Sequence, residues 1–259
     1  MREVLEKVAK GEISIEEAER LLRVLAIEEI GNLARIDIGR EYRKGIPEVI
    51  LGEGKAPEDL AGIVVKMLDK SGRAIISRVT KEQMKTVAKM LPKDVTLEIY
   101  DKARIMVIRR KGFRMEKTGG KIGILTAGTS DIPVAEEARV IAEEMGCEVI
   151  TAYDVGIAGI HRLLPPLKKM ITKDVDVLIV VAGREGALPS VVAGMIGVPV
   201  IAVPTSIGYG FGEKGVSALM AMLQSCSLGM AVVNVDGGVA AGAIATLIAN
   251  HAAKYKRKD

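Results

Sequence analysis

The sequence contains no tryptophan, and aromatic residues make up only 3% of its 259 residues. Proteins that bind single-stranded nucleic acid stack the bases on aromatic side chains, so this scarcity argues against nucleic acid as a partner. The formal net charge of +4 is modest, and much of the excess lies in Lys254, Lys256, Arg257 and Lys258. A basic tail of this kind is typical of a solvated helix end.

Long hydrophobic runs and cysteines are also scarce. No apolar run approaches the roughly 18 residues that span a bilayer, and no apolar segment with a cleavage site opens the chain. The two cysteines, Cys147 and Cys226, are too few for a zinc site, and a reducing compartment disfavours a disulfide between them. We therefore expect a cytoplasmic protein with no membrane partner, no metal held by its own side chains and two free thiols.

The N-terminal part favours helices followed by a small α/β unit. Ser14 and Glu17 form a capping box that predicts a helix over residues 15–30. Residues 39–55 are basic and rich in glycine around one predicted strand, which fits either a loop that reaches a ligand or a plain connector.

The next segment alternates helix and strand. Strands are predicted at residues 74–76 and 96–99, and a second capping box, Thr80 with Gln83, opens a helix between them. Residues 109–120 have the composition of a linker. A boundary near Thr118 would separate residues 1–118, a helical and small α/β domain, from residues 119–259.

The C-terminal part predicts a doubly wound parallel sheet. Five short apolar strands begin near Ile122, Glu148, Val175, Pro199 and Met230, and each is followed by a turn and a helical pattern. Strands that alternate with helices indicate an α/β fold with helices on both faces of the sheet. Ligands of such sheets bind beyond the carboxyl ends of the strands, so chemistry is expected in the loops there.

The loop after the first of these strands is a candidate phosphate site. Small hydroxyl residues run into a helix start, where free backbone amides and the helix dipole favour an anion. The residues concerned are Thr126, Gly128, Thr129, Ser130 and Asp131. An ordinary N-cap by Ser130 or Asp131 explains the same pattern.

The next two loops bring ionisable side chains together. The second holds Asp154, His161 and Arg162, which are suited to orienting a ribose or moving protons. The third holds a carboxylate, Glu185, between Gly183 and Gly186, which would let a ligand approach the backbone. Arg184 is either the ion-pair partner of Glu185 or a solvent-facing residue.

The last loops supply glycines and a thiol. Residues 206–215 contain four glycines but no Gly-Lys-Ser/Thr, so they form a flap or a plain flexible loop and not a Walker loop. Asp236 and Gly237 follow the fifth strand as candidate binding residues. Cys147 leads into a buried strand, whereas Cys226 lies in a polar loop and is the better candidate nucleophile.

These patterns resemble those of two known families. Gly128-Thr129-Ser130-Asp131, residues 182–189 and the glycines of residues 237–242 resemble aminoimidazole ribonucleotide carboxylases of purine biosynthesis. That family has Ser-Ala-His-Arg with a catalytic histidine after the second strand, where this chain has Thr151-Ala152-Tyr153-Asp154.

The LarB family is similar over nearly the whole chain. The resemblance rests on residues 45–49, 52–55, 153–162, 185–190 and Gln224-Ser225-Cys226. After the aspartate of the last strand this chain has Gly237-Gly238-Val239-Ala240-Ala241-Gly242 in place of that family's Asn-Gly-Phe-Gly-Ala-Gly.

The LarB resemblance implies a substrate, nicotinic acid adenine dinucleotide, carboxylated on its pyridinium ring by CO2 or bicarbonate and cleaved at its phosphoanhydride. The products would be AMP and pyridinium-3,5-biscarboxylic acid mononucleotide, the first intermediate of the nickel-pincer nucleotide cofactor. Cys226 would form a transient adduct and Glu185 would act as the base, with Asp154 and His161 as further catalytic candidates. Thr126, Thr129, Ser130 and Asp131 would seat phosphate and ribose.

No covalently bound cofactor is expected, and the sequence leaves open whether Mg2+ assists. A homo-oligomer is predicted because the last helix is rich in alanine and glycine, and the related purine carboxylases form octamers. The alternatives are an aminoimidazole ribonucleotide carboxylase or mutase and a noncatalytic nucleotide sensor.

Overall fold

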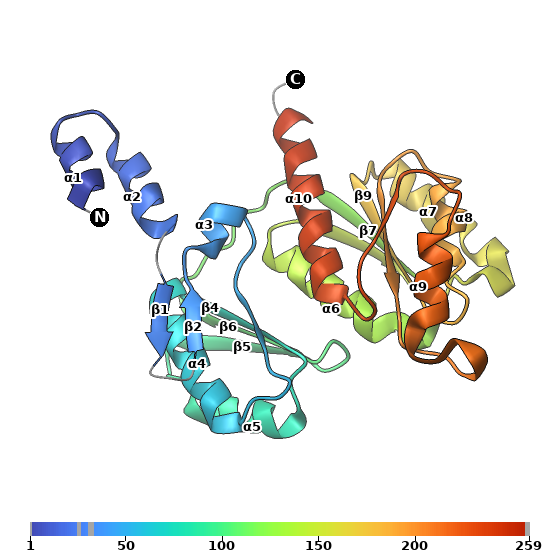
Figure 1. Cartoon of the computed structure of the whole chain (residues 1–259), viewed down its shortest axis with the longest axis horizontal. Coiled ribbons are helices and arrows are strands. Elements are labelled where there is room, and N and C mark those ends of the chain that lie inside the picture. Colours follow the sequence, from blue (N-terminus) through green and yellow to red (C-terminus); the bar gives the residue numbers. More distant parts are fainter. Residues whose placement is uncertain (1, 25–26, 31–33, 257–259) are drawn as a thin grey trace. The chain divides into compact units, whose positions relative to one another are not determined.

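The computed structural model describes residues 2–24, 27–30 and 34–256 (Figure 1). Contacts divide the chain into two compact units. The first is Met1–Tyr100 with Ile105–Arg114, and the second is Asp101–Arg104 with Met115–Asp259. None of the described helices is long and apolar enough to cross a membrane.

The chain begins with two helices, α1 (Arg2–Ala9) and α2 (Ile15–Val24). The hydroxyl of Ser14 accepts a hydrogen bond from the Glu17 amide at 3.1 Å, as the capping box requires. The predicted extension of this helix to Ile30 is wrong, because β1 (Ile27–Ile30) pairs antiparallel with β2 (Ala34–Asp37). The backbone hydrogen-bonding groups of this short segment pair with β2, and the sequence pattern did not reveal this partner.

The rest of the first unit packs helices against a four-stranded sheet of order β3-β4-β6-β5. Its elements are α3 (Arg40–Lys44), β3 (Val49–Leu51), α4 (Pro57–Ser71), β4 (Arg73–Ser77), α5 (Lys81–Met90), β5 (Val95–Tyr100) and β6 (Ile105–Arg110). The strands predicted at residues 74–76 and 96–99 are confirmed as β4 and β5, and the capping box of Thr80 and Gln83 opens α5. Arg109 and Arg110, assigned to a linker, instead end β6, where they pair with β5.

The second unit is the predicted doubly wound sheet. All five strands are parallel, in the order β11-β10-β9-β7-β8. Its strands are β7 (Lys121–Thr126), β8 (Glu148–Ala152), β9 (Val177–Ala182), β10 (Val200–Pro204) and β11 (Met230–Val232). Its helices are η1 (Thr129–Asp131), α6 (Ile132–Glu144), η2 (Ile157–Arg162), α7 (Leu164–Thr172), α8 (Leu188–Ala193), η3 (Gly210–Gly215), α9 (Val216–Leu223) and α10 (Gly238–Lys256).

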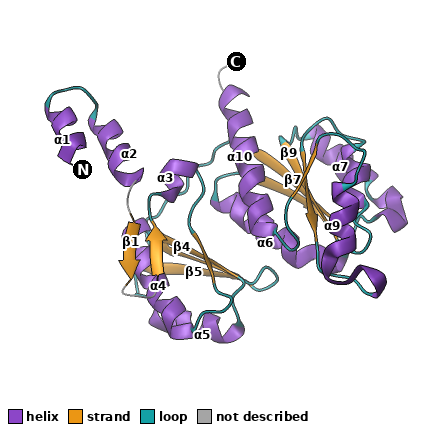
Figure 2. Ribbon diagram, viewed as in Figure 1, coloured by secondary structure: helices purple, strands orange, loops and turns teal. Residues whose placement is uncertain are grey.

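Helices cover both faces of this sheet (Figure 2). Alternate strand residues such as Ile124 and Ile179 pack against α6 and α10, and their neighbours Leu125 and Val180 form the core that contains residues of α7, α8 and α9. This alternation follows from the two-residue period of a strand buried on both faces.

The small residues of α10 pack against α6 within the second unit. A Cβ on Gly242 would lie 2.6 Å from the Ala138 carbonyl oxygen of α6, and one on Gly238 would lie 2.3 Å from the Val134 carbonyl oxygen. Ala241 is fully buried in the same contact region. The alanine and glycine content of this helix is therefore explained by its packing on α6 and does not itself indicate an oligomer.

Candidate functional site

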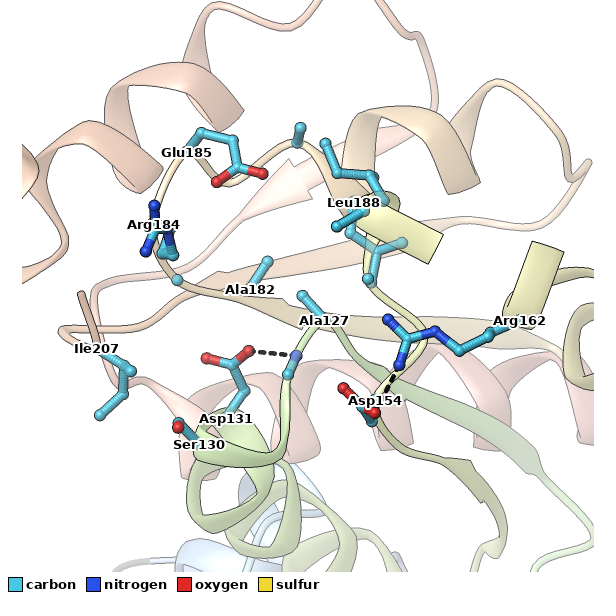
Figure 3. A pocket seen from close by; sticks show the side chains of 16 residues that line it. Ala127, Ser130, Asp131, Asp154, Arg162, Ala182, Arg184, Glu185, Leu188 and Ile207 are labelled. Carbon is cyan, nitrogen blue, oxygen red and sulfur yellow. Dashed lines mark hydrogen bonds and ion pairs between the residues drawn. The ribbon is translucent and has the colours of Figure 1, made fainter. Parts of the chain in front are cut away.

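A cavity of about 520 Å³ opens at the carboxyl edge of the C-terminal sheet (Figure 3). Its walls come mainly from the loops that follow β7, β8 and β9. The strand order places β7 between β8 and β9, so the chain leaves the first strand in one direction and later returns to its other side. This is the switch point at which doubly wound sheets bind ligands, and the volume suits a small molecule.

The loop after β7 supplies Gly128, Ser130 and Asp131 to the cavity wall. Asp131 is only 4% exposed. Its Oδ2 accepts a hydrogen bond from the Gly128 amide at 2.9 Å, and its Oδ1 accepts one from the Thr205 hydroxyl at 2.7 Å. Burial raises the pKa of Asp131, against the opposing effect of these hydrogen bonds. The carboxylate thus fixes the shape of the loop as well as lining the cavity.

The structure does not place two of the predicted phosphate-binding hydroxyls in the cavity wall. Thr126 is fully buried, and its Oγ1 accepts a hydrogen bond from the Asp154 amide at 3.0 Å. Thr129 is exposed and lies outside the set of lining residues. Thr126 therefore joins the loops after β7 and β8, and the candidate seat is reduced to Gly128, Ser130 and Asp131.

The loop after β8 brings Asp154 and Arg162 together. Arg162 Nη1 lies 2.6 Å from Asp154 Oδ2, and both residues line the cavity. Asp154 has a φ of +58°, a left-handed conformation that costs energy for a residue with a side chain. The neighbouring Gly156 allows a close approach, since a Cβ there would lie 2.5 Å from the Ala127 carbonyl oxygen.

The predicted catalytic histidine of this loop lies elsewhere. His161 is exposed and is not among the residues that line the cavity. Tyr153, which stands where the purine carboxylases have histidine, donates its hydroxyl hydrogen bond to Glu136 on α6. Burial, followed by this hydrogen bond, raises the pKa of Tyr153 to about 12, so the phenol keeps its proton at neutral pH.

The loop after β9 forms the opposite wall. Glu185 is exposed and lines the cavity, and Arg184 beside it stacks on Tyr209, with its Cζ 4.4 Å from the ring centroid. A Cβ on Gly183 would lie 2.4 Å from the Ile207 carbonyl oxygen, so glycine is required where the loops after β9 and β10 meet. Gly186 has a φ of +63° and packs on Ala218 of α9 instead of lining the cavity.

The remaining binding candidates support the loop after β10. Asp236 Oδ1 accepts a hydrogen bond from the Ser206 amide at 2.8 Å, and Ile207 of the same loop lines the cavity. Asp236 and Gly237 do not line it. The sequence analysis did not identify Thr205, whose buried hydroxyl donates a hydrogen bond to Asp131. The feature that could have indicated it is a polar residue directly after an apolar strand.

Cys226 lies at the other end of α9 from the cavity loops. It is exposed, in the loop that precedes β11, and the Gly229 carbonyl of this loop accepts the amide of Val200, the first residue of β10. Because Val200 begins β10, this loop lies near the amino edge of the sheet. Within one chain the structure therefore does not bring Cys226 to Glu185. Cys147 is buried and its thiol contacts Asn250.

The cavity wall combines three carboxylates, Asp131, Asp154 and Glu185, with two guanidinium groups, Arg162 and Arg184. Among the described residues, no group of three or more His, Cys, Asp or Glu side chains is arranged to hold a metal ion. Guanidinium groups bind phosphate and carboxylate, and carboxylates bind hydroxyl groups or accept protons. The arrangement suits an anionic substrate with a reaction that moves protons.

Comparison with known proteins identifies both units. Residues 27–111 match the LarB/PurE-like N-terminal domain, and residues 121–258 match the AIR carboxylase family. An uncharacterized protein of Methanocaldococcus jannaschii is 47% identical over 96% of each chain. The N5-carboxyaminoimidazole ribonucleotide mutases of M. jannaschii and Thermotoga maritima are 35% and 29% identical over 48% and 49% of this chain, and over 75% and 74% of their own lengths. The chain belongs to the LarB family, and its C-terminal unit is an AIR carboxylase domain.

Proposed function

We propose that this carboxylase-family protein carboxylates the pyridinium ring of nicotinic acid adenine dinucleotide with CO2 or bicarbonate and cleaves the phosphoanhydride to release AMP. The observation that carries the proposal is the set of ionisable groups in the cavity: a carboxylate, Glu185, lines it, and neither of the chain's two described histidines does. The identity of the substrate comes from the resemblance to the LarB family, and the ionisable groups of the cavity support this choice.

The purine carboxylases and mutases are the nearest alternative, because the curated relatives include mutases of that kind. That chemistry calls for an imidazole at the site of carboxylation. In this chain His161 is exposed outside the cavity, and His251 on α10 packs against Tyr255 with ring centroids 5.0 Å apart. A protonated phenol bonded to Glu136 occupies the position of the family's catalytic histidine. These features disfavour the alternative.

Carboxylation of a pyridinium ring needs a nucleophile and a base. The ring is electron-poor, so its carbon attacks CO2 only after a thiolate adds next to it and converts the ring to an enamine. The new carbon–carbon bond leaves a proton on the same ring carbon. In our proposal Glu185 takes that proton, and the electron pair of the broken C–H bond restores aromaticity as the thiolate leaves.

Cys226 is the thiol that we assign to this step, and its place outside the cavity wall supports a role for a second copy of the chain. Within one chain the thiol lies at the amino edge of the sheet and Glu185 at the carboxyl edge. Cys226 is exposed, whereas Cys147 is buried and burial raises its pKa. We therefore propose a homo-oligomer in which Cys226 of one copy enters the cavity of another.

Mixing inactive variants tests this arrangement. Cys226→Ser and Glu185→Gln should each lack carboxylation, which is followed with nicotinic acid adenine dinucleotide and labelled bicarbonate. Oligomers reassembled from equal amounts of the two variants should recover about a quarter of wild-type activity, because about a quarter of the composite sites would contain both native residues. The matched control mixes either variant with the double variant, which restores nothing.

Three outcomes would contradict the proposal. A wild-type protein that fixes no label would reject the substrate. A Cys226→Ser protein that carboxylates at the wild-type rate would reject the covalent mechanism and favour the purine alternative, tested with N5-carboxyaminoimidazole ribonucleotide. Mixed oligomers that contain both variants, shown by co-purification of two tags, but remain inactive would reject the shared site. In the first of these cases, binding of the dinucleotide without turnover would favour a noncatalytic sensor.

A further inference from the structure

The cavity has two separate ends, each with one carboxylate and one guanidinium group. Glu185 and Arg184 follow β9, Asp154 and Arg162 follow β8, and the loop with Ser130 follows β7 between them (Figure 3). Neighbouring strands are about 4.8 Å apart, so the loops after β8 and β9 are separated by about 10 Å at their strand ends. A dinucleotide presents its pyridinium ring and its phosphoanhydride at different points along its length, so one set of side chains does not serve both reactions.

We propose that Asp154 and Arg162 form the phosphoanhydride-cleaving end of the cavity, with Arg162 as the phosphate clamp and Asp154 as the catalytic base for water. This inference rests on the proposed function, because it assigns residues to the second half of that reaction. Carboxylation is left to the Glu185 end.

Arg162 is suited to the clamp. Guanidinium groups donate paired hydrogen bonds to phosphate oxygens and keep their charge at any physiological pH. The chain reaches this position through η2, in which Gly159 breaks the helical geometry with a φ of −141° and a ψ of 59°. Arg162 Nε then donates to the Gly159 carbonyl at 3.4 Å, while Nη1 contacts Asp154 at 2.6 Å. The guanidinium is thus held in place before substrate binds.

The position of Asp154 is also fixed before substrate binds. Its amide donates to the buried hydroxyl of Thr126 at 3.0 Å, and its backbone has a left-handed φ of +58°. Strained backbone of this kind persists only where surrounding contacts impose it. Arg162 engages Oδ2, and Oδ1 is the oxygen that we assign to water.

The step balances without another reactant besides water. The Asp154 carboxylate accepts a proton as the water oxygen bonds to one phosphorus of the anhydride. The bond from that phosphorus to the bridging oxygen breaks, and the bridging oxygen leaves with the electron pair on the other phosphate. Arg162 stabilises the negative charge that develops on the phosphate oxygens. The products are two monophosphates, one of which is AMP, and the proton on Asp154 is then released to solvent.

Separating the two half-reactions tests the assignment. The probe is nicotinic acid adenine dinucleotide with labelled bicarbonate, and label fixation and AMP release are measured in the same samples of full-length protein. Asp154→Asn should fix label within about threefold of wild type but release AMP about 100-fold more slowly, the usual scale for a positioned base. The carboxylated dinucleotide should accumulate. Arg162→Lys should recover part of the AMP release that Arg162→Gln loses, because lysine keeps the charge without the paired donors.

Glu143→Gln is the matched control. Glu143 also contacts an arginine, with Oε2 2.6 Å from Arg139 Nη1, but it lies on α6 and does not line the cavity. This variant should release AMP and fix label at wild-type rates. It separates the effect of the cavity pair from that of removing any partly exposed carboxylate.

The outcomes distinguish this inference from the proposed function. A wild-type protein that neither fixes label nor releases AMP rejects the proposed function itself. A wild-type protein that does both, together with an Asp154→Asn protein that releases AMP normally, rejects only the present assignment. Parallel loss of both activities in a folded Asp154→Asn protein also rejects it.

A binding measurement tests the clamp if the Asp154→Asn protein melts at much lower temperature. The ligand is a dinucleotide with a methylene bridge in place of the anhydride oxygen. Arg162→Gln should bind it at least tenfold more weakly than Glu143→Gln does, and equal binding overturns the clamp.

Discussion

The two edges of the C-terminal sheet use their charged residues differently. At the amino edge, Lys256 Nζ lies 2.6 Å from an Asp174 oxygen and 2.8 Å from an Asp176 oxygen, and Asp176 also accepts the Lys121 amide at 2.7 Å. These contacts fasten the end of α10 to the sheet. At the carboxyl edge, charged groups of three loops face a cavity of about 520 Å³.

Backbone strain alone does not separate the two edges. Asp154 and Arg184 at the carboxyl edge have φ values of 58° and 51°, and Asp174 at the amino edge has a φ of 56°. What differs is the cavity that each residue lines. Asp154 and Arg184 line the cavity of about 520 Å³ together with other charged groups, whereas Asp174 lines a smaller cavity of about 180 Å³ whose other lining residues are uncharged. The comparison teaches that a left-handed residue marks a candidate site only where several charged side chains line the same cavity.

The largest expected difference between the edges is in catalysis. Glu185→Gln should lower the rate of carboxylation by about 100-fold, because the amide cannot accept the ring proton. Dinucleotide affinity, measured by calorimetry, should stay within about twofold, since the shape of the cavity is kept. The control is Glu148→Gln at the start of β8, an exposed carboxylate at the amino edge, which should leave both quantities unchanged. An unchanged rate in Glu185→Gln would assign this residue to structure.

The next effect is on packing. Gly183→Ala places a methyl group 2.4 Å from the Ile207 carbonyl oxygen and 2.6 Å from the Thr205 hydroxyl, so the loops must separate. We expect the free energy of unfolding to fall by about 1–3 kcal/mol, as overpacked sites usually show. Gly197→Ala at the amino edge meets no atom within 4 Å and should cost much less. Chemical denaturation measures both, and equal costs would mean that the close approach at Gly183 is easily relaxed.

The pH dependence of stability should have opposite signs at the two edges. Burial raises the pKa of Asp131, so its contribution to stability is present below the ordinary pKa of aspartate and is lost as pH rises through the raised value. The hydrogen bond from Lys256 lowers the pKa of Asp174, so its contribution is present at neutral pH and is lost as pH falls through the lowered value.

Two asparagine variants measure these signs. Asp131→Asn keeps an acceptor for the Gly128 amide and gains a donor toward the Thr205 hydroxyl, so its melting temperature at neutral pH should equal or exceed that of wild type. Asp174→Asn should melt slightly below wild type at neutral pH, and the difference should disappear in acid. Scanning calorimetry from neutral pH downward, continued into acid until the two proteins of each comparison melt together or unfold, follows both titrations. A lower melting temperature of Asp131→Asn at neutral pH would show that the ionised carboxylate is needed by the fold.

The smallest effect is expected at the end of α10. Lys256→Ala removes an ion pair with the exposed Asp174 and one with the buried carboxylate of Asp176, which keeps its hydrogen bond from the Lys121 amide. The free energy of unfolding should fall by about 1 kcal/mol. The difference should shrink at high salt because solvent ions screen such pairs. Carboxylation should be unchanged. A larger loss that persists at high salt would show that α10 depends on this contact more than its exposure indicates.

The sequence predicted the elements whose signals are local. Five apolar runs located the strands of the C-terminal sheet, and the pair Thr80 and Gln83 located the start of α5. The segment 27–30 was assigned to a helix because so short a segment carries no decisive period, and only its pairing with β2 makes it a strand. β6 was missed for a related reason, since its end carries Arg109 and Arg110, which sequence composition assigns to a linker.

Sequence spacing was a weaker guide to the site. Glu185, Gly128 and Ser130 line the cavity as expected of residues at strand ends. Thr126 does not, because it is buried within the packed edge and its hydroxyl bonds to the next loop. His161 is adjacent to Arg162 in sequence, but only Arg162 lines the cavity.

By itself the sequence determined the parallel sheet, the family and the loops in which chemistry is possible, because these follow from residue periodicity and motifs within a few positions of one another. Tertiary structure decided which side chains meet. It paired Asp154 with Arg162 through the break at Gly159, placed Thr205 beneath Asp131, and put Cys226 at the opposite edge of the sheet from Glu185. Such contacts depend on strand order and on the direction of each helix between strands, which no local pattern of residues specifies.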